Sequence, residues 1–254
     1  MSALASISNR SFKDHFSGHA ASYAEARPTY PDDLFRYLAD LSPALDCAWD
    51  CATGSGQAAC ALADYFDRIV ATDASAEQIR AARVNDRVEY RVAPAEASGL
   101  PSESVGLITV AQALHWFDIE KFFEEAQRVL TPGGVLAFWC YGHCSVTPEV
   151  DGLLHDIYAS VDDYWPPERD IVESEYRGIV SPLAEIEGPS YSMKIEWTVE
   201  QVLAYIRTWS ASQAALRATG NDPVAGFAAE LERQWGRQPR TVIWPITLRV
   251  GRKL

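Results

Sequence analysis

Apolar and polar positions follow two alternating periods between residues 44 and 142. Short apolar runs have the length of buried strands, and the stretches between them repeat apolar residues at helical spacing. The runs predict strands at 44–51, 68–72, 88–92, 105–110 and 135–140, and the stretches between them predict helices at 57–65, 76–83 and 118–130. Strands that alternate with helices of this length are typical of a parallel, doubly wound α/β sheet.

The first forty residues have a helical period instead. Apolar residues recur at helical spacing from Phe12 to Tyr23. Pro31, followed by two acids, opens a second predicted helix, which ends at Pro43. Helices therefore precede the first predicted strand.

The pattern changes again after Tyr141. Residues 145–189 are rich in proline, acids and aromatics and are predicted to be mostly helical or irregular. The remaining predicted elements are a strand at 190–197, helices at 199–212 and 227–236, and a last strand at 241–250. Pro245 inside the last strand indicates an edge position or a bulge, because proline cannot donate to a strand ladder.

Composition narrows the possible partners. The 254 residues are 48% hydrophobic, which suffices for one sizeable core or a core with a small lid. The net charge of -13 repels phosphate backbones and anionic lipid, so we expect neither nucleic acid nor membrane as a partner. No stretch approaches the ~20 apolar residues of a membrane span, and no signal peptide is apparent.

The cysteines favour a reducing compartment. They number five, an odd count, and several lie in apolar runs, so we expect reduced thiols and a cytoplasmic protein. Cys140 and Cys144 flank a histidine, but no second ligand pair follows at the spacing of a zinc site. We therefore predict no metal.

The first predicted strand ends in a turn of small residues. The chain reaches Asp50 and then passes through Gly54 and Gly56 into a helix, which would leave backbone N–H groups free to meet a ligand. Ala59 stands where a dinucleotide fold has its third glycine. Asp73 ends the second strand, where an acid can accept hydrogen bonds from ribose hydroxyls. The pattern suits NAD or an adenosyl group, and also a tight turn without a ligand.

Five blocks in this order resemble the class I S-adenosylmethionine-dependent methyltransferases. They are WDCATGSGQ, ATDASAEQI, APAEASGLP, VAQALHWFD and VLTPGGVLAFW. The small-molecule branch called methyltransferase type 11, with its trans-aconitate methyltransferase-like members, is the most similar. The resemblance implies a three-layer, Rossmann-like α/β fold with a seven-stranded sheet, whose last strand is antiparallel, and a helical lid insertion. It implies one catalytic domain, with a helical cap at 1–43, the cofactor-binding core at 44–142, the lid at 143–189, and further sheet and roof helices at 190–254.

The resemblance also implies cofactor contacts. Asp50 would lie near the methionine ammonium, and Asp73 would bind the ribose. Gln112 would face the methionine end, over which Tyr23 and Arg27 would close. Other implied contacts are the turn backbone beneath the methionine (Cys51, Ala52, Gly54, Gly56) and the ribose and adenine borders (Ala74, Gln78, Ala95, Glu96).

Two positions depart from the family pattern. Ala52 replaces the usual first glycine, which is tolerable if its φ is negative. Pro94 replaces the usual acid of the third block and removes a backbone N–H. We expect ordinary rather than tight cofactor affinity. A non-catalytic cofactor-binding or sensor protein on the same fold remains an alternative, and a nicotinamide oxidoreductase is a weaker one.

The acceptor site is predicted around His115, which follows the fourth strand. His115 could take a proton from an acceptor, hydrogen-bond a substrate or be satisfied by local backbone. Trp116 could contact the substrate or pack under the lid, and the resemblance suggests Arg207 as a candidate partner for an anionic acceptor. The stretch 111–114 lacks the Asn/Asp-Pro-Pro-Tyr-like element of enzymes that methylate base or amide nitrogens. We expect a small-molecule acceptor, methylated at a carboxylate or hydroxyl oxygen; the sequence carries no signal of oligomeric state.

Overall fold

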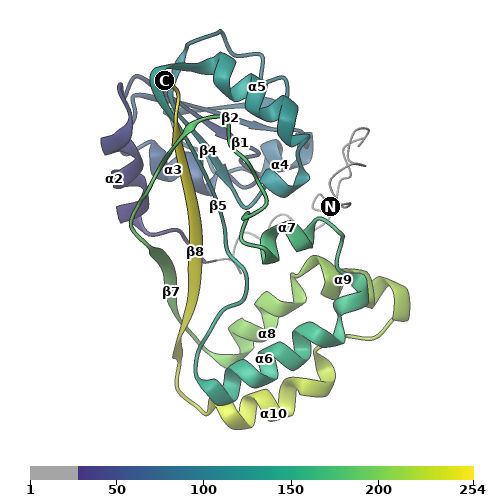
Figure 1. Cartoon of the computed structure of the whole chain (residues 1–254). Coiled ribbons are helices and arrows are strands. Elements are labelled where there is room, and N and C mark those ends of the chain that lie inside the picture. Colours follow the sequence, from purple (N-terminus) through teal and green to yellow (C-terminus); the bar gives the residue numbers. More distant parts are fainter. Residues whose placement is uncertain (1–27) are drawn as a thin grey trace.

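A mixed sheet between two helical layers forms the core of the molecule (Figure 1). The computed structural model describes residues 28–254, so the predictions for the N-terminal helix, Tyr23 and Arg27 lie outside the described residues. Along the sheet the strand order is β3-β2-β1-β4-β5-β8-β6, and β7 pairs with β8 away from this path. The first five strands are parallel: β1 Cys47–Cys51, β2 Arg68–Asp73, β3 Val88–Val92, β4 Val105–Ala111 and β5 Leu130–Cys140.

The last strand, β8 (Arg240–Arg252), runs antiparallel to three neighbours: β5, β6 (Ala184–Ile186) and β7. Residues 247–252 pair with β5, and residues 240–246 pair with β7 (Tyr191–Trp197). Pro245 lies in the part of β8 that pairs with β7, opposite Ser192. It lies outside the part of β8 that pairs with β5. The predicted Rossmann-like sheet with an antiparallel last strand is therefore confirmed.

Both faces of the central parallel strands β1, β2 and β4 are largely buried, whereas the edge strand β3 is half-buried or exposed along its length. Alternate residues face opposite sides: Ala48, Ile69 and Leu107 pack in one cluster, and their neighbours pack in the other. The first cluster includes α2 (Asp32–Leu41) and α3 (Gln57–Leu62), and the second includes α5 (Ile119–Val129). Helix α4 (Ala76–Ala81) lies against β2 and β3. Three layers result.

A second group of helices gathers around the far ends of β7 and β8 (Figure 1). Helix α6 packs against α10, and α8 packs against both α9 and α10. The bounds of these elements are α6 Pro148–Ser160, η2 Asp162–Tyr164, α7 Arg169–Glu173, α8 Val199–Arg207, α9 Ser210–Thr219 and α10 Ala225–Trp235. The group covers the end of the sheet at which β4 and β5 finish.

Three local predictions were wrong. Residues 199–212 form two helices, because the extended backbone of Trp209 interrupts them and places its ring against Tyr158 and Tyr205. A short strand, β6 (Ala184–Ile186), lies in the stretch predicted to be helical or irregular and gives the described sheet eight strands rather than seven. Strand β5 begins at Leu130 rather than at residue 135, because Leu130 already pairs with Val105 before the register shifts.

Candidate functional site

The turn after β1 has a left-handed backbone at three positions. The φ angles of Ala52, Gly54 and Gly56 are 54°, 53° and 76°. The negative φ on which Ala52 was expected to depend is therefore not present, and its methyl group sits on a backbone that favours glycine. A Cβ at Gly54 would meet no heavy atom of residues 28–254 within 4 Å, so within the described part of the chain this side of the turn is open.

Asp73 holds the turn against the end of β2. Its Oδ2 accepts a 2.9 Å hydrogen bond from the Gly54 backbone N–H, and its Oδ1 accepts one of 2.9 Å from Ser75. The Ser75 hydroxyl in turn accepts a hydrogen bond from the backbone N–H of Gln78 in α4. The predicted ribose acid and the glycine turn are thus in direct contact, with Ala74 and Gln78 on the adjoining segment.

Packing explains the small residues at positions 56 and 59. A Cβ at Gly56 would overlap the Tyr90 hydroxyl, which donates a 2.6 Å hydrogen bond to the carbonyl of Arg83. Gly56 is therefore required by the close approach of β3 as well as by its φ. Ala59 is fully buried on α3 within the core cluster. An alanine fits at this position, where a dinucleotide fold has its third glycine.

The carboxylate of Asp50 is buried and accepts hydrogen bonds from two hydroxyl groups. Thr53 donates to its Oδ2 at 2.6 Å, and Thr109 donates to its Oδ1 at 2.7 Å. Burial raises its pKa to about 6, although these hydrogen bonds and the backbone N–H of Ala59 favour the charged form. Asp50 therefore ties β1, its turn and β4 together.

The third block lies beside α5. Ala95 is buried, and Glu96 accepts a 2.8 Å hydrogen bond from the backbone N–H of Asp118, the residue that caps α5. Pro94 is exposed.

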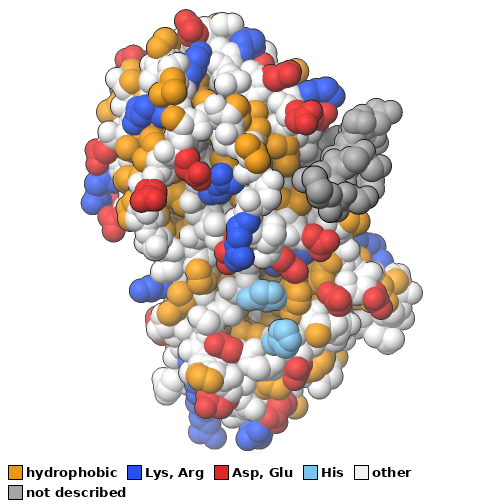
Figure 2. Space-filling model, in the orientation of Figure 1, with side chains coloured by type: hydrophobic (Ala, Val, Ile, Leu, Met, Phe, Trp, Pro, Cys, Tyr) orange, Lys and Arg blue, Asp and Glu red, His pale blue; other side chains and the backbone are white. Residues whose placement is uncertain are grey.

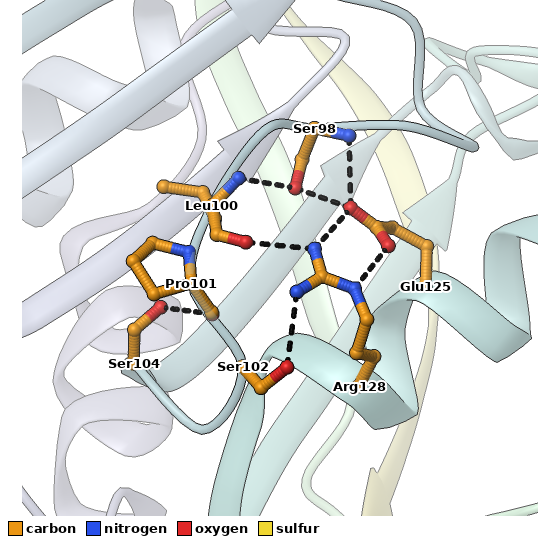
Figure 3. Close-up of polar contacts among 7 residues, drawn as sticks. All are labelled: Ser98, Leu100, Pro101, Ser102, Ser104, Glu125 and Arg128. Carbon is orange, nitrogen blue, oxygen red and sulfur yellow. Dashed lines mark hydrogen bonds and ion pairs between the residues drawn. The ribbon is translucent and has the colours of Figure 1, made fainter.

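A buried carboxylate on α5 fixes the loop that follows this block (Figure 3). Glu125 accepts hydrogen bonds from the Ser98 backbone N–H and hydroxyl at 2.9 and 2.5 Å, and pairs with Arg128 at 2.7 Å. Arg128 also donates to the carbonyl of Leu100 at 2.7 Å (Figure 3). The sequence analysis missed this clamp, because charged residues on a helix are usually solvated.

Gln112 joins the ends of β4 and β5. Its side-chain nitrogen donates to the carbonyl of Tyr141, and its side-chain oxygen accepts from the Tyr141 backbone N–H, both at 2.9 Å. The φ of Gln112 is 55°, a left-handed angle that turns the chain toward η1 (Leu114–Trp116). This amide clamp helps to shape a cavity.

A cavity of about 240 Å³ lies where β4 and β5 end, between the sheet and the second group of helices. Figure 2 shows histidine side chains among hydrophobic ones on this face of the molecule. Among the residues that the structure describes, six aromatic side chains contribute to its wall: Trp116, Tyr141, Tyr158, Trp165, Tyr205 and Trp209. Its polar and charged lining includes Gln112, His115, His143, Asp151, His155 and Arg169. Such a wall suits a small, partly apolar molecule.

His115 lies in this wall and is 7% exposed. Its Nδ1 lies 3.2 Å from the hydroxyl of Tyr176, a fully buried side chain that follows α7. Burial lowers the pKa of His115 to about 3, and the nearby charge of Arg169 acts in the same direction. A histidine of this pKa is neutral near pH 7 and is a weak base. The structure therefore favours hydrogen bonding over proton removal among the predicted roles.

Among the described residues, Arg169 lines the cavity, and Arg207, the predicted contact for an anionic acceptor, lies outside its wall. Arg207 pairs with Asp222 at 2.8 Å and is not part of the cavity wall. Arg169 lies over the ring of Trp165 at 4.8 Å and donates through Nε to the Tyr158 hydroxyl at 3.0 Å. The sequence analysis missed Arg169 because it belongs to a short charged segment without helical period. The role of Arg207 as an acceptor contact stays a prediction.

No helix within residues 28–254 is long and apolar enough to cross a membrane. Nor do three or more histidine, cysteine or acidic side chains in this range come together in a group that could hold a metal ion.

Similarity to known proteins agrees with this geometry. Residues 49–138 match the family model of the methyltransferase domain. A Dictyostelium discoideum protein named as a methyltransferase is 37% identical over 216 residues, which cover 83% of this chain and 82% of that protein. A solved structure from Anaeromyxobacter dehalogenans, described as a type II methyltransferase, has a TM-score of 0.85 at 45% identity and covers 90% of this chain and 98% of its own.

The name of a third relative includes a cofactor. A Saccharomyces cerevisiae protein named as an S-adenosylmethionine-dependent methyltransferase is 28% identical over 131 residues, which cover 48% of this chain and 45% of that protein. Relatives of this kind oppose the nicotinamide oxidoreductase alternative. From its fold, its glycine turn and these relatives, the chain belongs to the class I S-adenosylmethionine-dependent methyltransferases.

Proposed function

We propose that S-adenosylmethionine binds across the ends of β1 and β2. The open side of Gly54 and the adjacent carboxylate of Asp73 fit a ribose and a methionine chain laid against the turn. The cofactor would supply a sulfonium that already activates the methyl group. Ala74, Gln78, Ala95 and Glu96 would border the ribose and adenine, and Cys51 and Gly56 the methionine. Tyr23 and Arg27 would close over it.

Asp50 and Gln112 would shape the methionine end indirectly. Both side chains are held by protein partners, Asp50 by two threonine hydroxyls and Gln112 by the Tyr141 backbone. A buried carboxylate still attracts a nearby ammonium group, and such a charge would favour the ionised form of Asp50. We therefore propose an electrostatic role for Asp50.

The acceptor would be a small molecule held in the aromatic cavity, methylated at a carboxylate or hydroxyl oxygen. The observation that carries this proposal is the position of the cavity beside the cofactor turn. Gln112 lies in the cavity wall two residues after Val110, which pairs with Cys51 at the start of the turn. The segments 143–189 and 190–254 would then serve as lid and roof. Membership of the trans-aconitate methyltransferase-like branch stays a prediction.

The number of protons released by the reaction favours a carboxylate oxygen over a hydroxyl oxygen as the methyl acceptor. Methyl transfer from a sulfonium to a carboxylate gives a methyl ester and releases no proton, whereas transfer to a hydroxyl releases one. A group of pKa about 3, such as His115, is a poor acceptor for a hydroxyl proton. The cavity would align the acceptor with the methyl group and exclude water, and its aromatic faces would stabilise the sulfonium charge.

Turnover of S-adenosylmethionine on matched acceptors tests this function. Purified protein is incubated with the cofactor and with pairs of small aromatic carboxylates and their alcohols. S-adenosylhomocysteine, methylated product and proton release are then measured. We expect a methyl ester with no proton released per turnover. Cofactor binding without turnover on any acceptor would favour the sensor alternative, and one proton per turnover would identify a hydroxyl acceptor.

A further inference from the structure

The buried hydroxyl of Tyr176 determines which ring nitrogen of His115 carries the proton. Tyr176 is 0% exposed, and its hydroxyl lies 3.2 Å from His115 Nδ1. A buried O–H without an acceptor costs about 1–3 kcal/mol. Within residues 28–254 the nitrogen lone pair of His115 is the acceptor that this hydroxyl reaches, so the phenol donates to Nδ1. Neutral His115 then carries its own proton on Nε2.

His115 therefore offers a donor to the cavity. Its Nδ1 is occupied by Tyr176 on the buried side, while the ring forms part of the cavity wall. The other ring nitrogen, Nε2, makes no hydrogen bond with any residue from 28 to 254. An N–H group in this position can bind a lone pair or an anion but cannot accept a proton.

Arg169 supplies a second set of donors. Its Nε is used by Tyr158 at 3.0 Å and by Glu173 at 3.4 Å. Its terminal nitrogens, Nη1 and Nη2, make no hydrogen bond within the described part of the chain. The guanidinium stacks 4.8 Å from the ring centre of Trp165, and the side chain is 16% exposed. The outer fork of the guanidinium is therefore available to a ligand, although Glu173 offsets part of its charge.

The other ionisable groups of the wall do not compete for this fork. Asp151 accepts a 2.6 Å hydrogen bond from the Val146 backbone N–H at the start of α6. The pKa of His143 is lowered, by burial first and then by Arg169, so its ring is neutral near pH 7. Its ring packs edge-on against Tyr158, 4.1 Å between centres.

We propose that Arg169 and the Nε2–H of His115 form a subsite for the carboxylate of a small aromatic acceptor, with Tyr176 as the positioning residue that fixes the His115 tautomer. A guanidinium fork matches the planar, two-oxygen geometry of a carboxylate. The side chains of Trp165, Trp209 and Trp116 line the same cavity, so an aromatic body bound there would contact aromatic side chains. The inference rests on the proposed function, because it takes the cavity as the acceptor site.

The first test measures binding of two probes that differ in charge. Benzoate and benzyl alcohol are titrated into isotope-labelled protein, and the tryptophan side-chain N–H resonances are followed. We expect benzoate to bind at least tenfold more tightly than benzyl alcohol. Replacement Arg169→Gln should abolish this difference, because a charged hydrogen bond is worth roughly one power of ten in affinity. Arg233→Gln removes an exposed arginine of α10 that pairs with Glu230, and should leave the difference unchanged.

Two outcomes of this titration would overturn the subsite. One is equal affinity for both probes, or no benzoate binding, in the wild-type protein. The other is a loss of benzoate binding in Arg207→Gln but not in Arg169→Gln, which would assign the anion to Arg207. Cofactor affinity is measured on the same samples. A protein that binds cofactor but not benzoate would keep the proposed function and lose the subsite. A protein that binds benzoate but not cofactor would keep the anion site and lose the proposed function.

The second test observes the tautomer directly and needs no ligand. Nitrogen NMR of the wild-type protein should show His115 with its proton on Nε2 and an unprotonated Nδ1. Replacement Tyr176→Phe removes the donor and should shift the ring toward a mixture of tautomers, an effect that a purely structural role of Tyr176 would not produce. A wild-type His115 protonated on Nδ1 would overturn the inference.

Discussion

The backbone N–H of Gly54 donates a 2.9 Å hydrogen bond to the carboxylate of Asp73. This contact joins the turn after β1 to the end of β2, and a second one, from Thr53 N–H to the Thr72 carbonyl at 2.9 Å, runs beside it. The acid proposed to bind ribose is therefore already oriented by the turn proposed to hold the methionine.

Replacing Ala52 with glycine should stabilise the protein. The left-handed φ of 54° costs alanine roughly 1–2 kcal/mol, and the greater freedom of glycine in the unfolded chain offsets about half of this. We expect the free energy of unfolding to rise by about 0.5–1 kcal/mol in denaturant titrations. Ala61→Gly, within α3, is the matched control and should lower it by about 1 kcal/mol. A lower free energy of unfolding in Ala52→Gly would show that the left-handed backbone angle does not strain Ala52.

Replacing Gly56 with alanine should be severely destabilising. The residue has a φ of 76°, and its new Cβ would overlap the Tyr90 hydroxyl. We expect a loss of at least about 2 kcal/mol in unfolding free energy. Adding Tyr90→Phe should recover part of this loss, because the overlap disappears while the backbone strain remains. Purely additive effects of the two substitutions would show that the hydroxyl is not the obstacle.

The free energy of unfolding should fall as Asp50 loses its proton between about pH 4 and pH 6. Its pKa is raised to about 6 in the folded protein, against about 4 in an unfolded chain. The folded state therefore binds the extra proton between these values, and stability falls as pH rises through this window. Relative to Asp50→Asn, we expect the wild-type free energy of unfolding to fall by roughly 2 kcal/mol between pH 4 and 7. A difference between the two proteins that stays constant with pH would rule out the raised pKa.

His115 should not titrate in the neutral range. Its pKa of about 3 keeps the ring uncharged from pH 5 to 8. In proton NMR its imidazole shifts should be flat across this range, and the pH profile of methyl transfer should show no inflection that His115→Asn removes. A titration of this ring with a midpoint near 6.5 would restore its candidacy as a general base.

Much of the core could be predicted because its information is local. Most of the parallel strands are predominantly apolar runs, and the turn from Asp50 to Gly56 with Asp73 twenty-odd residues later has a recognisable spacing. Small disagreements arose where no local signal exists. Strand β6 is three residues long, and the break at Trp209 contains neither glycine nor proline.

The acceptor cavity was predicted less completely, because tertiary packing creates it. Trp116 and His115 were identified from their place after β4. Arg169 and Tyr176 come from a segment more than fifty residues further on, and only the packing of α7 beside η1 brings them to His115. Arg207 was named from the family resemblance, whereas no local pattern in the sequence indicated that Arg169 would line the cavity.

Calorimetric titration with S-adenosylhomocysteine tests the central claim most directly. The wild-type protein should show saturable binding and no response to NADH. Asp73→Asn should bind at least tenfold more weakly, because a ribose hydroxyl loses a charged acceptor. Asp64→Asn, at an exposed position between α3 and β2, should bind like the wild type. Absence of binding by the wild-type protein, or equal affinity in the Asp73→Asn variant, would contradict a cofactor held across the ends of β1 and β2.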